Sequence, residues 1–177
     1  MNKFAVIDVG SNSVRLMFVA DGKVLYKALN TTRLGDGLAA SSMLKDEAIA
    51  RSVNAVVEFY DRAIAEGAEG VYAFATAAVR SATNGQAFVD GVRALRPLSV
   101  EVITGEEEAE IGILGALGNA DGGVIDVGGA STEIVIKEQG ELIFKKSVNI
   151  GVRSGCYGSS YLPFGIYCLS MDYFRRS

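Results

Sequence analysis

Histidine is absent from the 177-residue sequence, and cysteine and proline occur only twice each. Without histidine the protein has no phosphohistidine chemistry, no histidine-bound metal centre for phosphate hydrolysis and no Ser-His-Asp triad. The phosphate loop G-x-x-x-x-G-K-[ST] is missing as well. Neither cysteine is followed by a phosphate-cradling loop and an arginine, which disfavours a cysteine phosphatase. Carboxylates, arginines, hydroxyl groups and backbone amides remain for catalysis.

The sequence also lacks the features of secreted and membrane proteins. No apolar run approaches the roughly 20 residues that span a bilayer, and the start at Met1 has no signal-peptide layout. Cys156 and Cys168 are too few for a disulfide or metal framework. We therefore expect a cytoplasmic protein that has no membrane partner.

The charge balance argues against nucleic acid as a partner. The formal net charge is −4, so no broad basic face is expected. A polyanionic ligand would instead be held by backbone amides, a few arginines and a metal ion. Apolar residues make up 49% of the chain, which is enough for a buried core.

The apolar pattern alternates between short strands and longer helices, which is typical of an α/β domain. Asp21-Gly22 signals a tight hairpin. Ser41 or Ser42 is expected to cap the first long helix, and Gly67 to end it. We expect strands at residues 3–8, 14–20, 23–29, 71–76 and 100–104, and helices at 44–66, 86–96 and 106–117.

The opening of the chain is repeated further along. Residues 124–128 (VIDVG) repeat residues 6–10 at an offset of 126 − 8 = 118 residues. The similarity continues into a strand expected at residues 132–137, a turn at 138–140 and a second strand at 141–149. This duplicated β-turn-β-turn-β opening predicts two similarly built domains that face one another, at residues 1–121 and 122–177.

Each copy places a glycine-rich turn directly after a strand: the first turn runs from Asp8 to Ser13 and the second turn from Asp126 to Ser131. Glycine has no Cβ, so consecutive N–H groups can point at phosphate oxygens, and nearby hydroxyl groups add donors. Asp8 and Asp126 can hold Mg²⁺ or its waters. A pair of ordinary hairpin turns is the plainer alternative, which the duplication disfavours. The expected phosphate-binding residues are Gly10, Ser11, Asn12 and Ser13, with Gly128, Gly129, Ser131 and Thr132 in the second copy.

Four stretches of the sequence resemble the exopolyphosphatase/guanosine-pentaphosphate phosphohydrolase family. They are residues 5–13, 75–80, 103–109 and 124–133, and the resemblance covers roughly residues 3–152. The two turns are shared with actin-like kinases, whereas the stretches around Arg80 and Gly105 point to the phosphatase branch. The resemblance implies an actin-like (ribonuclease H-like) mixed-sheet domain, followed by the β-hairpin opening of a second similar domain.

The resemblance assigns the catalytic carboxylate to Glu108. It is expected to orient or deprotonate the water that attacks the terminal phosphorus. Glu106 and Glu107 precede it, and three successive glutamates also suit the start of a helix, where the helix dipole favours negative charge. A shift of one residue in the assignment is therefore an open alternative.

The resemblance also implies roles for Arg80 and Glu133. Arg80 is expected to neutralise phosphate oxygens in the transition state, with a helix-start salt bridge as the alternative. Glu133 is expected to help Asp126 hold the metal, with a solvent-facing strand position as the alternative. Arg15 and Arg33 are further sources of positive charge around a polyanion, although surface solvation is the commoner role of arginine.

Two places depart from the family's pattern. Ala130 stands where a third glycine is common. Its methyl group would restrict the allowed backbone conformations if that position needs a positive φ. From about residue 154 the sequence matches no family motif, so we expect an incomplete second domain, with a truncated or frame-shifted reading as one explanation. Three strands without covering helices would expose an apolar face. A marginally stable, self-associated or inactive chain is then expected, with a homodimer as one form.

These observations predict a phosphoanhydride hydrolase that releases orthophosphate from inorganic polyphosphate or guanosine pentaphosphate, with Mg²⁺ as its cofactor. Guanosine tetraphosphate is a further expected ligand. An actin-like small-molecule kinase is the alternative enzyme, although no acceptor-side aspartate is recognisable. A noncatalytic fragment that binds polyphosphate or a nucleotide is the alternative from another functional class.

Overall fold

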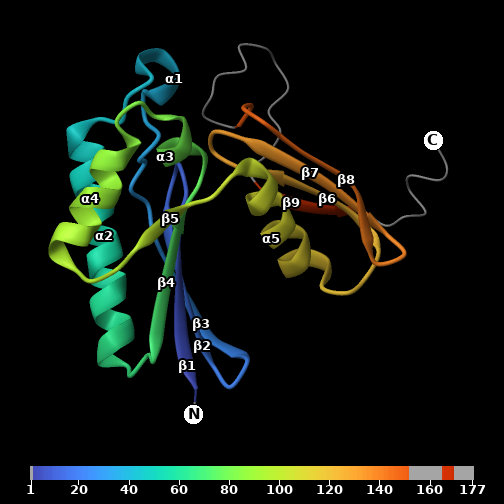
Figure 1. Cartoon of the computed structure of the whole chain (residues 1–177), viewed down its shortest axis with the longest axis horizontal. Helices are drawn as coiled ribbons and strands as arrows, with labels where there is room; N and C mark the ends of the chain where they lie inside the picture. The colour runs from blue at the N-terminus through green and yellow to red at the C-terminus, as the bar shows by residue number, and fades with distance from the viewer. Residues whose placement is uncertain (1, 152–164, 170–177) are drawn as a thin grey trace. The chain divides into compact units, whose positions relative to one another are not determined.

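The computed structural model describes residues 2–151 and the backbone of residues 165–169 (Figure 1). The chain divides into two compact units, Met1–Ile103 and Thr104–Ser177. This division comes earlier than the boundary expected at residues 121 and 122, because helix α5 (Gly105–Leu117) packs on the sheet of the second unit. The tail that begins at about residue 154 lies outside the described residues except for 165–169. None of the described helices is long and apolar enough to cross a membrane.

The first unit is built on a mixed five-stranded sheet with the strand order β3-β2-β1-β4-β5. Strand β1 pairs antiparallel with β2 and parallel with β4, and β4 is parallel to β5. The strands are β1 Lys3–Val9, β2 Val14–Ala20, β3 Lys23–Asn30, β4 Gly70–Ala75 and β5 Val100–Val102. The predicted α/β class with a mixed sheet is confirmed for this unit.

Two helices, α2 (Asp46–Ala65) and α4 (Gly85–Leu95), cover one face of this sheet (Figure 1). Every second residue of β1 is buried in the core that these helices close, which is the alternation that a half-covered sheet requires. Its largest fully buried members include Phe18, Ile7 and Phe88. Each such side chain contributes about 1.5–3 kcal/mol relative to exposure.

The beginning of α2 differs from the prediction, whereas its end agrees. The helix starts after Lys45, which provides no side-chain cap. Ser41 and Ser42 belong to an unpredicted short helix, α1 (Leu38–Ser41), and Ser42 ends it with φ 56°. A cap by either serine is therefore wrong. Gly67, with φ 83°, donates its N–H to the Ile64 carbonyl at 2.9 Å and confirms the predicted stop.

The second unit contains an antiparallel four-stranded sheet with the order β8-β7-β6-β9. The strands are β6 Gly122–Val127, β7 Thr132–Glu138, β8 Glu141–Val148 and β9 Gly165–Leu169. Ala109 and Ile113 of α5 pack on Val124 and Val135 of the sheet. The expectation of three strands without a covering helix is therefore wrong, because α5 serves that role.

Strand β9 comes from the part of the sequence that matched no family motif. It pairs antiparallel with β6, on the edge that corresponds to the β1 edge occupied by the parallel strand β4. Its five residues are too short a run to identify a strand from the sequence. The second sheet is thus extended by a strand of opposite direction to its counterpart in the first unit.

The internal repeat is also present in the backbone geometry. Asp21-Gly22 has φ of 49° and 76°, and Gln139-Gly140, 118 residues later, has 54° and 81°. Two successive positive φ angles are typical of a type I′ hairpin turn, as Asp-Gly predicts. The register shifts between Phe18 and Val19 in one hairpin, and between Ile136 and Lys137, at the same offset, in the other. The two copies therefore share the position of the register shift as well as the sequence.

Candidate functional site

The first turn and Arg80 follow the carboxyl ends of neighbouring parallel strands. Val9 at the end of β1 lies opposite Ala75 at the end of β4, and the Thr76 N–H donates to the Val9 carbonyl at 3.2 Å. Helix α3 (Ala77–Ser81), which carries Arg80, begins directly after Thr76 at this end of the two strands (Figure 1). Ligands of open α/β sheets bind outside the carboxyl ends of the strands. The topology therefore brings two predicted site elements together within the first unit.

The carbonyl groups of the first turn are directed into the protein. The Gly10 N–H donates to the Ser13 carbonyl at 3.0 Å, while the carbonyls of Ser11 and Asn12 accept hydrogen bonds from residues of the loop after β3. A Cβ on Gly10 would lie 3.3 Å from the Ser13 carbonyl oxygen, so only glycine fits without displacement. Carbonyl oxygens repel anions. Because these carbonyls accept hydrogen bonds within the protein, the turn favours an anion over a cation.

The second turn has the same internal hydrogen bond. The Gly128 N–H donates to the Ser131 carbonyl at 2.9 Å, and a Cβ on Gly128 would lie 3.0 Å from that oxygen. Ala130 is not among the described non-glycine residues with a positive φ. The methyl group of Ala130 therefore does not restrict the backbone of the turn, and alanine is compatible with this position. The serines of both turns, Ser11, Ser13 and Ser131, are at most 5% exposed.

The segment after β8 supports the second turn. The Thr132 hydroxyl donates to the Ile150 carbonyl at 2.5 Å, so its proton is used within the protein. A Cβ on Gly151 would lie 2.5 Å from the Ala130 nitrogen and 2.6 Å from the Gly129 carbonyl carbon. Real Cβ atoms do not approach backbone this closely, so glycine is required there. The phosphate-binding role of Thr132 stays a prediction, beside this structural one.

Replacing Gly151 by alanine is expected to push the second turn out of place. Overpacking of this kind destabilises a protein by about 1–3 kcal/mol, and thermal unfolding should show a lower Tm. Binding of tripolyphosphate, measured by calorimetry, should weaken with it. Gly115→Ala is the matched control, because nothing lies within 4 Å of a Cβ at that helical position. Equal melting of the two variants would contradict the close packing of Gly151 on the second turn.

The aspartates that precede the two turns have different neighbours. Asp8 lies opposite Arg15 in the β1–β2 ladder, and the Arg15 Nη1 is 3.7 Å from its Oδ2. At the equivalent position of the second copy, Asp126 lies opposite Glu133. Like charges on directly opposite residues repel each other, and a bound cation would offset that repulsion. The metal roles of Asp126, Glu133 and Asp8 stay predictions.

Glu133 is not the solvent-facing strand residue of the alternative interpretation. It is only 3% exposed, and its carboxylate accepts a hydrogen bond from the Ser147 hydroxyl at 2.7 Å. No group of three metal-ligating side chains occurs in the described part of the chain. A pair of carboxylates nevertheless fits Mg²⁺, which takes one or two carboxylates and completes its shell with waters and substrate phosphates.

Arg80 is half-buried and held from two sides. Its backbone N–H donates to the Thr76 carbonyl at 3.0 Å, and its Nη1 donates to the Ile103 carbonyl at 2.7 Å. A guanidinium has five N–H donors in a fixed fork, so the hydrogen bond to the Ile103 carbonyl fixes the direction of the group. Arg80 is thus a positioned cation at the carboxyl end of the first sheet.

The three glutamates at the start of α5 have distinct surroundings. Glu107 forms a capping box with Thr104: its Oε2 accepts the Thr104 N–H at 2.8 Å, and its own N–H donates to the Thr104 hydroxyl. These hydrogen bonds, first of all the one from the Thr104 backbone, hold the pKa of Glu107 below its ordinary value. Glu106 pairs with Lys145 at 3.0 Å. The helix-start explanation therefore accounts for Glu106 and Glu107, while Glu108 is the partly buried member of the three.

The capping box should make the stability of the second unit pH-dependent. Because the folded-state pKa of Glu107 is lowered from 4.5, its contribution is present above that value and is lost as pH falls through the folded-state pKa. Denaturant unfolding at pH 7 should show Thr104→Ala to be less stable by about 1 kcal/mol. The unfolding difference between Glu107→Gln and the parent chain should shrink at pH 3. A difference that persists unchanged at pH 3 would rule out the charged form as its source.

Comparison with known proteins gives a consistent result. The Ppx/GppA phosphatase family matches the chain over residues 16–154. Exopolyphosphatase 2 of Mycobacterium tuberculosis is 36% identical over 169 residues, which cover 85% of this chain and 53% of that protein. Guanosine-5'-triphosphate,3'-diphosphate pyrophosphatase of Photobacterium profundum is 36% identical over 162 residues, which cover 86% of this chain and 32% of that protein.

Solved structures agree with the sequence comparison. The crystal structure of the Aquifex aeolicus member of the Ppx/GppA family matches with a TM-score of 0.72 and 31% identity, over 85% of this chain and 52% of that one. The chain therefore spans about half the length of the first of these relatives and of this structure, and about a third of the length of the second relative.

Proposed function

The chain belongs to the Ppx/GppA phosphatase family, and from this premise we propose that it acts in the hydrolysis of terminal phosphoanhydrides. The substrates proposed are inorganic polyphosphate and guanosine pentaphosphate, in keeping with the names of the relatives. Its fold is the actin-like α/β fold of the family, as the resemblance predicted.

One observation carries the proposal beyond the family name. In the first unit, a glycine turn with internally bonded carbonyls and a half-buried arginine both follow the carboxyl ends of β1 and β4. Backbone N–H groups suit phosphate oxygens, and a guanidinium suits the charge that develops on a transferring phosphoryl group. Phosphoryl transfer depends mainly on such positioning and electrostatic stabilisation.

In the proposed reaction Glu108 accepts a proton from a water molecule, while the oxygen of that water attacks the terminal phosphorus. The new O–P bond forms as the bridging P–O bond breaks, and the shortened chain leaves as an anion with the electron pair of that bond. Arg80 neutralises the non-bridging oxygens during this step. The N–H groups of each turn are proposed to bind phosphate oxygens.

Asp126 and Glu133 would hold the metal ion in this proposal. Their pairing across β6 and β7, with Glu133 buried, is the donor set that fits Mg²⁺. When bound there, Mg²⁺ supplies positive charge beside the phosphate oxygens. Asp8, with Arg15 close to it, is the proposed metal ligand of the first turn.

The test measures orthophosphate release from long-chain polyphosphate and from guanosine pentaphosphate in the presence of Mg²⁺. The chain is compared with a version extended by a complete second domain, and binding is measured for both by calorimetry. The proposal expects release from at least one substrate by the extended version. Binding without release by either version would support the noncatalytic alternative, and absence of binding would remove the proposed substrates.

A further inference from the structure

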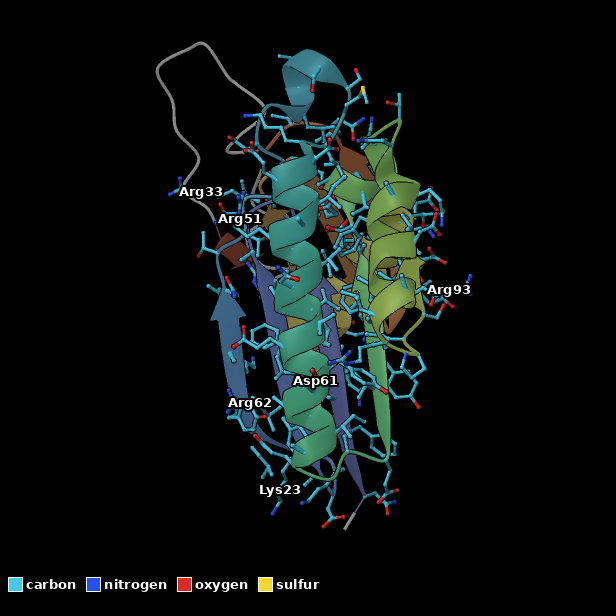
Figure 2. The ribbon with its side chains drawn as sticks, turned by 90° about the vertical axis from the view of Figure 1, so that its left-hand side faces the viewer. Lys23, Arg33, Arg51, Asp61, Arg62 and Arg93 are labelled. Atoms are coloured by element: carbon cyan, nitrogen blue, oxygen red, sulfur yellow. The ribbon has the colours of Figure 1, made fainter. Side chains whose placement is uncertain are left out.

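A cationic pocket lies in the first unit, outside the elements assigned to hydrolysis. It has a volume of about 370 Å³ and lies between the loop after β3 and the first turns of α2. Arg33, Lys45 and Arg51 line it together with Asp36 and Glu47. Figure 2 shows Arg33 and Arg51 at the same end of α2.

The lining has three cationic and two acidic side chains, a net charge of 3 − 2 = +1, and its two guanidinium groups belong to Arg33 and Arg51. Lys45 is balanced by Asp36, with 3.3 Å between its Nζ and the Asp36 Oδ2. The Arg51 Nε donates to the Thr32 carbonyl at 2.7 Å, which fixes the direction of the guanidinium. Within the described residues, neither Arg33 nor Arg51 forms an ion pair with a carboxylate. Two exposed guanidinium groups beside one pocket are a favourable arrangement for a phosphate-type anion.

The pocket is connected directly to the first turn. The Arg33 N–H donates to the Asn12 carbonyl at 2.9 Å, and the Gly35 N–H donates to the Ser11 carbonyl at 2.8 Å. Leu34, between these two donors, is fully buried in the core. The loop that presents Arg33 is therefore fixed to the turn by hydrogen bonds and to the core by an apolar anchor.

Arg33 has an unfavourable backbone conformation for a residue of its type. Its φ is 51°, in the left-handed region that costs a non-glycine residue of order 1 kcal/mol and that glycine or asparagine adopts more readily. An arginine in such a position is explained most simply by a use for its side chain. The pocket provides that use.

We infer that this pocket binds a diphosphate unit of the substrate beyond the phosphates held by the first turn. The inference rests on the proposed function and names a further part of its binding site. The same chemistry has two sources, namely the next phosphates of a polyphosphate chain or the 3'-diphosphate of guanosine pentaphosphate. A longer chain has more phosphates with which to occupy both the turn and the pocket, so we expect affinity to rise with chain length.

The experiment is calorimetric titration of the full chain with long-chain polyphosphate, tripolyphosphate and guanosine pentaphosphate. Arg33→Asn removes the guanidinium and suits the positive φ. Its Kd for long-chain polyphosphate should rise about tenfold, as expected for one charge-assisted hydrogen bond. Its Kd for tripolyphosphate should stay within about twofold. Selective weakening of guanosine pentaphosphate instead would support the pocket and assign it to the nucleotide's 3'-diphosphate.

Arg93→Asn is the matched control, because it makes the same change of charge at an exposed arginine on α4 (Figure 2). If both variants weaken polyphosphate binding equally, the effect comes from net charge and the pocket is overturned. If Arg33→Asn weakens tripolyphosphate binding as much as long-chain polyphosphate binding, the effect comes from the turn and the pocket is likewise overturned. No change with Arg33→Asn would overturn it as well. Failure of the parent chain to bind any of the three ligands would instead contradict the proposed function.

Discussion

Replacing Glu108 by glutamine is expected to lower the rate of orthophosphate release by about 10²–10⁴-fold, the usual contribution of a general base. Glutamine keeps the size and one hydrogen-bond acceptor of the side chain, but it cannot take a proton from water. Substrate binding should change much less, because a base acts on the water and not on the phosphates. The measurement is kcat and KM in the form of the protein that releases phosphate, with the Kd for polyphosphate measured separately.

The neighbouring glutamates provide the control for this prediction. Glu106→Gln removes the ion pair with Lys145, and that pair lies on the packing between α5 and β8. Its kcat should stay within about threefold of the parent, because a surface ion pair contributes little to stability. Full activity in Glu108→Gln together with loss of activity in Glu106→Gln would show that Glu108 is not the catalytic carboxylate and would move that role to Glu106. Full activity in both would leave Glu107 as the remaining candidate among the three glutamates.

Replacing Arg80 by alanine should produce the other large effect. An arginine that neutralises charge on a transferring phosphoryl group contributes about 10³–10⁵-fold to kcat, so a loss of at least about 10³-fold is expected. Arg80→Lys should recover only part of it, because an ammonium group keeps the charge but not the fork of donors. Both variants are measured by phosphate release at saturating substrate.

Arg80 also has a structural contact, which must be separated from its effect on the reaction. Loss of the hydrogen bond to the Ile103 carbonyl should lower stability by about 1–3 kcal/mol. Thermal unfolding measures that part, and Arg93→Ala controls for removal of one arginine from the first unit. If Arg80→Ala releases phosphate at the parent rate while its Tm falls, its role is structural alone.

Much of the fold follows from local sequence chemistry. The 118-residue repeat predicted two equivalent hairpins, and the type I′ turn at Asp21-Gly22 has its counterpart at Gln139-Gly140. Long amphipathic helices were equally readable. Short elements were not: α1 and α3 are about one turn each, which is too short for a helical period to appear. Helix α1 also displaced the predicted serine cap of α2.

The second unit shows what a one-dimensional pattern leaves open. Helix α5 precedes β6 in the chain and was grouped with the strands before it, yet Ala109 and Ile113 pack on the strands after it. Tertiary packing decides such a grouping, and the period of the helix is the same in either case. The buried state of Glu133 was likewise open, because a strand pattern gives alternation without saying which face is covered.

The candidate site was predictable in its residue types and less so in its supporting contacts. Glycine turns, Arg80 and the glutamate cluster stood out as sequence features. The capping box that separates Glu107 from Glu108 depends on the hydroxyl of Thr104, and it is visible only as a set of hydrogen bonds. Gly151 gave no signal at all, since its close approach to Gly129 and Ala130 joins segments that are distant in sequence.

The central claim is that water, and no other acceptor, receives the terminal phosphoryl group. The most direct measurement is mass spectrometry of the orthophosphate that the extended protein releases from polyphosphate in water enriched in oxygen-18. Hydrolysis forms the new O–P bond from water, so each orthophosphate released should contain one solvent oxygen. Orthophosphate without solvent oxygen, or a phosphorylated acceptor in its place, would contradict the account and support the kinase alternative.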